Sequence, residues 1–302
     1  MPSPFHQKKP ANSVSWDSAT IEAATWRDTH DDPKVELEVF YYSPRKPCST
    51  PKKSAHIRHS EDRVIGEEHL LNKVQHFCRL LHHALQKDRY ERQITARIYA
   101  RVQVGTISPQ LGFTLERRVS TASGAGKGVF VASGHIKKNS LVAFYPGTVY
   151  RPGEHIFCQS ISNSFILRCA DGVLIDGNDS GLSKLVYRSC SFRDRVGAHL
   201  LCDLTWTTEY PANPLAVGQY INNAPSENAA NVTYQEADLP IKHFPAEYRR
   251  YIPNIPYNSA LLAVSDDPVL KLVLLVATRD IEAGEELFST YFTLIESEEK
   301  MI

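Results

Sequence analysis

After Gly105 the chain is a succession of short β-forming runs separated by turn residues, and this texture constrains its fold more than any other feature. The clearest runs are 128–132, 140–144, 165–168, 173–175 and 270–277. Gly, Pro, Asn, Asp and Ser stand between them and favour turns. No long helical pattern separates the runs, as a doubly wound parallel sheet would require. We therefore expect a mainly β fold of several small sheets.

The segment 67–104 contains neither Gly nor Pro, and its apolar residues recur at helical spacing. These residues are Leu70, Val74, Phe77, Leu81, Leu85, Tyr90, Ile94, Ile98 and Val102. Because spacings of three and four place them on one face, the pattern predicts one or two amphipathic helices. We interpret His76, His82 and His83 as polar residues of these helices rather than as metal ligands.

Residues 1–65 lack such regularity. Residues 35–41 alternate apolar and polar side chains only briefly, which predicts one short strand. The stretch 43–63 carries six Lys or Arg residues and three Pro, so it buries too little surface to order itself. We expect a solvated basic linker, with a nuclear-import signal as the alternative. The expected organisation is an irregular segment (1–65), a helical region (66–114), a β-rich domain (115–295) and a tail (296–302).

Composition excludes several classes of function. Thirty-four Lys and Arg residues balance thirty-four Asp and Glu residues, so charge favours neither nucleic acid nor an anionic membrane as a direct partner. None of the six cysteines has a zinc-knuckle spacing, and we expect no metal site. The first residues form no apolar signal segment, and the longest apolar run, 272–277, has the length of a strand. We expect an intracellular protein, in the nucleus or the cytoplasm.

A glycine-rich motif, SGAGKGVFV, occupies residues 123–131. It is not a Walker loop, because Thr121 stands where the first glycine belongs and Gly128 follows the lysine. Its glycine spacing also differs from a dinucleotide fingerprint, and β-formers follow it rather than a helix. Two readings remain open: a turn whose backbone approaches a ligand closely, or a plain tight hairpin.

Five motifs recur in a specific order along the second part of the chain. They are GAGKGVFV (124–131), AFYPGTV (143–149), VLIDG (173–177), GQYINNAPSENAANVTY (218–234) and RDIEAGEELFSTY (279–291). Together they resemble the SET domain, the fold of most protein lysine methyltransferases, over about residues 115–295. The resemblance implies several short curved sheets with a carboxy-terminal segment threaded under a preceding loop. It also implies transfer of a methyl group from S-adenosylmethionine to a lysine of a protein substrate.

The resemblance further implies which residues form the site. Tyr291, in the closing motif, would contact both the methyl group and the cofactor, and Tyr145 would line the lysine channel. Tyr234 would line it too if Asn231 is the second asparagine of the motif, but not if Asn228 is. Tyrosines suit such a channel because each offers an apolar wall and a hydroxyl. The residues expected to hold the cofactor are Ala125, Gly126, Lys127, Gly128, Asn222, Asn223 and Tyr291.

Some positions depart from the family pattern. Asn223 replaces a histidine, and no cysteine cluster follows Tyr291 to build a zinc-bound cap over the lysine channel. Ser289 stands where several relatives have an aromatic residue that limits the number of methyl groups, so product multiplicity stays open. Two alternatives to an active enzyme remain: an inactive SET-like binding module, and an interaction protein that acts through the helices at 67–104.

Overall fold

The computed structural model describes residues 63–86, 98, 101–196, 199–225, 229–259 and 266–289. These residues belong to one compact unit, residues 57–302. The predicted strand at 35–41, nearly all of the basic linker, Asn228, Tyr291 and the tail lie outside the described residues. The predicted division into four segments therefore stays a prediction.

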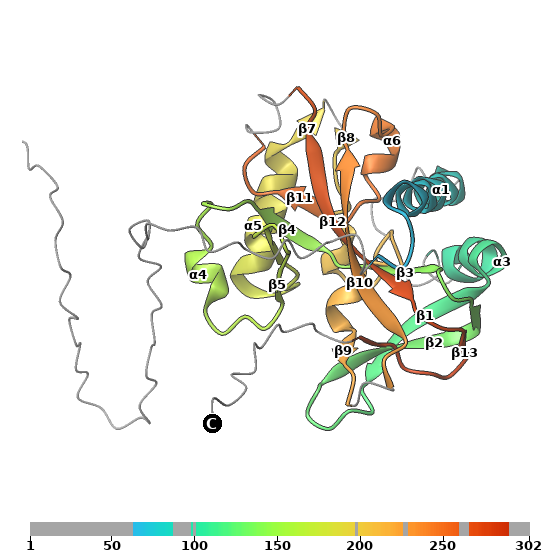
Figure 1. The fold of residues 1–302 in the computed structure, drawn as a ribbon. Coiled ribbons are helices and arrows are strands. Elements are labelled where there is room, and N and C mark those ends of the chain that lie inside the picture. Colours follow the sequence, from blue (N-terminus) through green and yellow to red (C-terminus); the bar gives the residue numbers. More distant parts are fainter. Residues whose placement is uncertain are drawn as a thin grey trace, which may run out of the picture. The chain divides into compact units, whose positions relative to one another are not determined.

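Two sheets carry the elements that bear the glycine, asparagine and closing motifs (Figure 1). One has the strand order β1–β2–β13, and the other has the order β3–β12–β10–β14–β9. Their bounds are β1 Phe113–Val119, β2 Lys127–Ile136, β13 Ile281–Glu282, β3 Leu141–Phe144, β12 Val269–Ala277, β10 Val232–Pro240, β14 Phe288–Ser289 and β9 Asn222–Asn223. Residues 272–277 of β12 are all fully buried, which explains their unbroken apolar run.

The carboxy-terminal strand β14 lies between two strands that follow each other in the chain, β9 and β10. It is parallel to both of them. Backbone hydrogen bonds join Ala224 N to Ser289 O at 2.8 Å and Asn231 N to Phe288 O at 2.9 Å. The closing segment is thus inserted between β9 and β10, as the threaded arrangement requires.

A four-stranded sheet and a two-stranded ribbon complete the described strands. Their orders are β11–β4–β6–β5 and β7–β8, with bounds β11 Asn254–Pro256, β4 Gly147–Tyr150, β6 Leu174–Asp176, β5 Ile166–Arg168, β7 Arg195–Val196 and β8 His199–Leu200. Gly147 has φ +141°, and a Cβ there would lie 2.1 Å from Asp176 O, so only glycine permits this approach. The prediction of a mainly β fold built from small sheets is confirmed.

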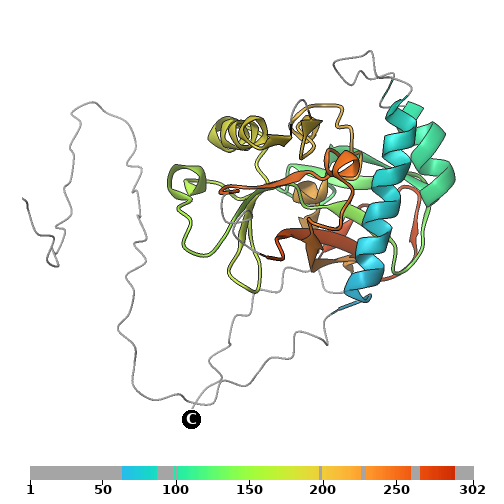
Figure 2. The same ribbon diagram turned by 90° about the horizontal axis from the view of Figure 1, so that it is seen from above.

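The predicted amphipathic helix is α1, and its apolar face is buried. Leu70, Val74 and Leu81 are fully buried, and Phe77 packs against Phe144 of β3. The helices with fully described bounds are α1 Glu67–Gln86, the π-helix η1 Gln103–Ile107, α3 Ser108–Leu111, α4 Phe157–Ser160, α5 Gly181–Arg193, the 3₁₀ turns η2 Thr205–Thr207 and η3 Gly218–Tyr220, and α6 Ala246–Arg249. None of the helices in the described ranges is both long and apolar enough to cross a bilayer. Viewed from above, α1 and the pair α4 and α5 lie at opposite sides of the sheets (Figure 2).

Helix α5 contradicts the expectation that no long helix interrupts the strands. Its buried face consists of Ser183, Tyr187, Cys190 and Ser191. Its apolar residues Leu182, Leu185 and Phe192 are instead exposed. Because these three apolar residues lie outside the buried face, the apolar periodicity that reveals most surface helices is weak in this segment.

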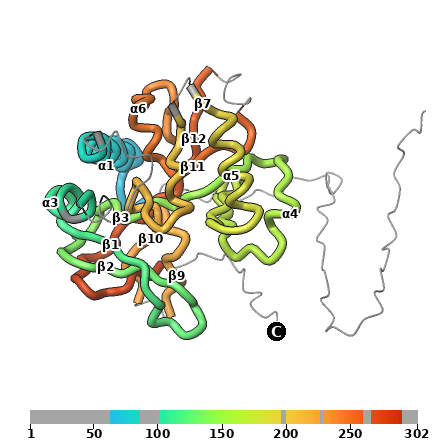
Figure 3. The backbone as a smooth tube through the Cα atoms, turned by 180° about the vertical axis from the view of Figure 1, so that it is seen from behind, coloured from blue at the N-terminus to red at the C-terminus, as the bar shows by residue number. Residues whose placement is uncertain are grey.

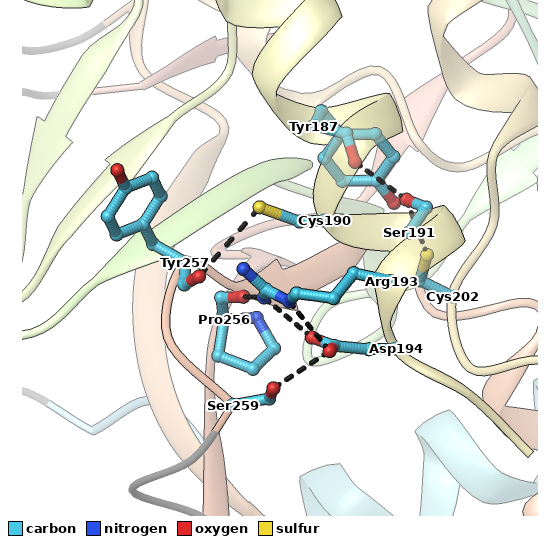
Figure 4. A network of polar contacts seen from close by, with 9 residues as sticks. All are labelled: Tyr187, Cys190, Ser191, Arg193, Asp194, Cys202, Pro256, Tyr257 and Ser259. Carbon is cyan, nitrogen blue, oxygen red and sulfur yellow. Dashed lines mark hydrogen bonds and ion pairs between the residues drawn. The ribbon is translucent and has the colours of Figure 1, made fainter. Parts of the chain in front are cut away.

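Polar contacts hold α5 in place (Figure 4). The Tyr187 hydroxyl donates to Asp203 O at 2.6 Å, and the Cys202 thiol donates to Ser191 Oγ at 3.0 Å. At the end of the helix, Arg193 pairs with Asp194, which also accepts a hydrogen bond from Ser259 at 2.8 Å. These contacts add to the packing of Tyr187 and Cys190 against Trp206 and Ile255.

Candidate active site

The glycine motif forms an open turn that leads into β2. Gly124 and Gly126 have φ values of +75° and +71°, which other residues adopt only with strain. A Cβ at either position would meet no atom within 4 Å, so the turn leaves space above its backbone. Ser120 N donates to Gly126 O at 2.9 Å and closes the turn. Ala125, between the two glycines, is half-buried, and its N–H donates to Ala122 O at 3.2 Å.

Glu286 of the closing motif locks this turn to the carboxy-terminal segment. Its buried carboxylate accepts hydrogen bonds from Ser120 Oγ at 2.6 Å, Thr121 N at 2.7 Å and Thr121 Oγ1 at 2.5 Å. A Cβ on Gly128 would lie 2.1 Å from Glu286 Oε1. Gly128 is therefore needed for contact between β2 and Glu286. The sequence offered no signal for this role beyond the place of Glu286 in the closing motif.

Asn222 brings the asparagine motif to the glycine turn. Its side-chain amide donates to Lys127 O at 2.9 Å, across 95 residues of chain. Asn223, the next residue of β9, is exposed and pairs with Ser289 of β14. The structure thus brings the expected cofactor residues of the glycine turn and of β9 together.

Two cationic side chains lie near the ring of Tyr220, a residue beside this junction that the motifs did not single out. The Arg117 guanidinium carbon lies 5.4 Å from the centre of its ring, and Lys127 Nζ lies 5.6 Å from it. The Tyr220 hydroxyl donates to Asp179 Oδ2 at 2.6 Å. Burial, and then this hydrogen bond to Asp179, raise the pKa of Tyr220 above its usual range, which keeps the phenol neutral. The position of Tyr220 two residues before Asn222 is the only sequence signal for it.

The two candidate channel tyrosines in the described region contact each other. The ring centres of Tyr145 and Tyr234 lie 6.2 Å apart at an interplanar angle of 65°, an edge-to-face contact. The Tyr145 hydroxyl donates to Phe165 O at 2.8 Å, and the Tyr234 hydroxyl donates to Ile221 O at 3.5 Å. A Cβ on Gly177 would lie 2.9 Å from Tyr145 Cε1, so this glycine lets the chain pack closely on the ring.

Asn231 connects Tyr234 with the closing motif. Its amide nitrogen donates to Glu286 O at 2.8 Å, and its amide oxygen accepts from Phe288 N at 2.9 Å. The residue is 1% exposed. These contacts favour Asn231 as the second asparagine of the motif, which is the alternative that makes Tyr234 a channel residue. Tyr291, the expected central tyrosine, lies two positions beyond Ser289 and outside the described residues.

One group of possible metal ligands exists in the described part of the chain. It consists of Cys169, Asp171 and Glu236. The Lys271 ammonium lies 2.8 Å from Asp171 and 3.8 Å from Glu236, so a cation already pairs with both carboxylates of this group. Burial raises the pKa of the Cys169 thiol far above its usual range, which disfavours the thiolate that binds metals.

Comparison with known proteins relates a large part of the chain to one curated protein. No protein-family model matches the chain. Human SET domain-containing protein 9 is 54% identical over 185 residues, which cover 61% of this chain and 60% of the relative. The Pongo abelii protein of the same name is also 54% identical over 185 residues, which cover 61% of this chain and 66% of the relative. The match therefore spans less than two thirds of either relative's length.

A search of solved structures returned, among others, ctPRC2 in an autoinhibited conformation bound to S-adenosylmethionine. It is 15% identical, the match covers 60% of this chain and 15% of that chain, and the TM-score is 0.30. The curated relatives carry the identification. Over the matched 185 residues this chain is a relative of SET domain-containing protein 9, and the resemblance to SET domains that its motifs indicate is confirmed.

Proposed function

We propose that this chain is an S-adenosylmethionine-dependent methyltransferase whose acceptor is a lysine side chain of a protein. The observation that carries the proposal is the hydrogen bond from Asn222 to Lys127 O, 2.9 Å long. It joins the glycine turn to β9, the strand beside which the closing motif runs. Tyr234 reaches the same place, because its hydroxyl contacts the carbonyl of Ile221, the residue before Asn222.

The glycine turn suits the cofactor. Its backbone is open at Gly124 and Gly126, so the methionine end can approach the main chain there. Arg117 and Lys127 place positive charge on the adjacent face of Tyr220, which favours the cofactor's carboxylate. When bound, the cofactor supplies an electrophilic methyl group on its sulfonium. Asn222 and Glu286 hold the turn in the shape that receives it.

The tyrosine pair suits a lysine acceptor. A lysine ammonium with a pKa near 10.4 is neutral only about four times in ten thousand at pH 7, so the site must favour the free amine. Tyr145 is 3% exposed, and its ring and that of Tyr234 form an apolar wall that lowers the pKa of an adjacent amine. The hydrogen bond from the Tyr145 hydroxyl to Phe165 O fixes the position of this hydroxyl at the wall.

An apolar surface on α4 and α5 supports a protein as the substrate. Its residues are Phe157, Ile161, Leu182, Leu185 and Phe192, each at least 45% exposed. The two helices contact each other, and exposed apolar residues on adjacent elements favour contact with a protein. Both helices are joined in the chain to residues that contact Tyr145. The segment after α4 ends at Phe165, which accepts the Tyr145 hydrogen bond, and the segment before α5 begins at Gly177, which packs on the Tyr145 ring.

Calorimetric titration with S-adenosylmethionine tests the cofactor. We expect the wild-type chain to bind it and Asn222→Ala to bind it about tenfold more weakly, since one hydrogen bond of about 1.4 kcal/mol is lost. Gln75→Ala, on the exposed face of α1, serves as the matched control and should bind like the wild type. Absence of binding by the wild type would end the proposal.

Transfer of a radiolabelled methyl group to lysate proteins tests the reaction, and acid hydrolysis identifies methyllysine. Tyr234→Phe and Tyr291→Phe should each lower the rate while cofactor affinity changes less. Tyr257→Phe is the control, because this tyrosine stacks on Tyr150 away from the pair. Cofactor binding without any transfer would instead favour the inactive binding module. Label found on another residue type would refute the lysine acceptor.

A further inference from the structure

A groove of about 400 Å³ runs along one face of α1. Its residues on α1 follow the spacing i, i+3, i+4, i+7 and i+8 of a single helical face, and they are His69, Asn72, Lys73, His76 and Phe77. The opposite wall consists of Gln110, Leu111, Phe113, Ser140 and Leu141. Figures 1 and 3 show α1 and α3 side by side, with β1 and β3 next to them. A space of this size lies at the lower end of the range for small-molecule sites.

The floor of the groove is apolar and its rim is basic. Phe77, Phe113 and Leu141 form the floor, and each is at most 6% exposed to solvent. All the ionisable side chains that line it are basic, and no described carboxylate is among them. Arg79 donates to His76 Nδ1 at 3.0 Å, which leaves the other ring nitrogen of His76 as a donor. The groove thus offers donors and positive charge above an apolar surface.

The positive charge of the rim belongs to this groove and not to α1 as a whole, as the other side of the helix shows. A second groove there is lined by Glu67 and Glu68 together with Leu71, His243 and Phe244. The ionisable residues that α1 itself contributes are thus basic in the first groove and acidic in the second. An anion gains attraction only in the first groove, while a cation would be repelled from it.

We propose that the groove between α1 and α3 binds a small apolar carboxylate. The apolar body lies on Phe77 and Leu141, and the carboxylate meets Lys73 and the donor nitrogen of His76. A peptide fits less well, because its main chain needs several hydrogen-bond partners. Beyond the basic side chains, the described lining offers only Asn72, Gln110 and Ser140 for this purpose. The proposal is independent of methyl transfer, since the groove shares no residue with the candidate active site.

Titration of the full chain with octanoate, followed by calorimetry, tests this proposal. Octan-1-ol has the same apolar body without the charge, and acetate has the charge without the body. We expect octanoate to bind at submillimolar concentration and both analogues to bind at least tenfold more weakly. Lys73→Met removes the charge and keeps an unbranched side chain, and it should weaken octanoate binding about tenfold. Gln110→Trp fills the groove from an exposed position and should abolish binding.

Lys137→Met is the matched control, because Lys137 is exposed and does not line the groove. It should bind octanoate like the wild type, and all three variants should melt within about 2 °C of it. The proposal is overturned if octanoate does not bind, or if Lys73→Met and Gln110→Trp bind it unchanged. It is also overturned if a short Glu- and Leu-containing peptide binds in a manner sensitive to Gln110→Trp while octanoate does not.

Discussion

The contact between Gly128 and Glu286 makes a quantitative prediction about the coupling of the glycine turn to the closing motif. In Gly128→Ala the new Cβ would lie 2.1 Å from Glu286 Oε1 and 2.9 Å from Cδ. The carboxylate cannot swing away freely, because Ser120 and Thr121 hold it with three hydrogen bonds of 2.5 to 2.7 Å. Relief of the overlap therefore breaks one or two of these bonds.

Hydrogen bonds to a charged group each contribute about 1.5–3 kcal/mol, and overpacking alone costs about 1–3 kcal/mol. Water can replace part of the lost bonding at Thr121, which is exposed. We expect Gly128→Ala to lower the free energy of unfolding by about 3 kcal/mol. For a domain of this size the loss corresponds to a fall in Tm on the order of 10 °C. Urea denaturation followed by circular dichroism measures the free energy directly.

A double-mutant cycle separates the overlap from other effects. Glu286→Ala removes both the obstacle and the bonds, so Gly128→Ala should cost little more in that background, and the two effects should not add. Gly66→Ala is the control for the substitution itself, because no atom lies within 4 Å of its Cβ and its φ is not positive. Additive effects in the cycle, or a loss below about 1 kcal/mol in Gly128→Ala, would refute the proposed steric coupling.

Three further predictions concern the rest of the fold and the surface. Asn231→Ala should lower the free energy of unfolding by about 3 kcal/mol in urea denaturation, because two buried hydrogen bonds to the closing motif are lost; a change below about 1 kcal/mol would contradict this. Burial raises the pKa of Asp203 to about 6, so the folded state binds its proton more tightly than the unfolded state. Its contribution to stability is present below pH 4 and is lost as pH rises towards 6, by about 3 kcal/mol. Asp203→Asn should remove this part of the pH dependence when the free energy of unfolding is measured at a series of pH values. If the variant and the wild type show the same difference in free energy between pH 4 and 6, the assignment to Asp203 is refuted. Leu185→Ser changes a side chain that is 64% exposed, so it should alter stability by less than about 0.5 kcal/mol while lowering methyl transfer to protein substrates; equal transfer rates would remove α5 from substrate contact.

The sequence predicts those parts of the fold whose signal is local. The buried face of α1 could be read from apolar spacing, and β12 from a continuous apolar run, because in both cases burial alone determines the residue type. Helix α5 was not predicted, because burial does not determine its residue types in the same simple way. It packs through Tyr187 and Cys190 and through polar contacts, while Leu182, Leu185 and Phe192 face solvent. A pattern that assumes apolar residues inside cannot detect such a helix.

The candidate site likewise contains residues that local motifs predict and residues that they do not. Motif order identifies the glycine turn, Asn222 and Tyr145, because each belongs to a short segment with a recognisable composition. The groups that assemble these segments act across long separations: Glu286 contacts Thr121 over 165 residues, and Asn231 contacts Glu286 over 55 residues. Neither residue type signals its partner, since a buried carboxylate and a buried amide accept any suitable donor. The motifs thus predict what the site contains, whereas polar clamps built around the inserted strand β14 determine that its parts meet.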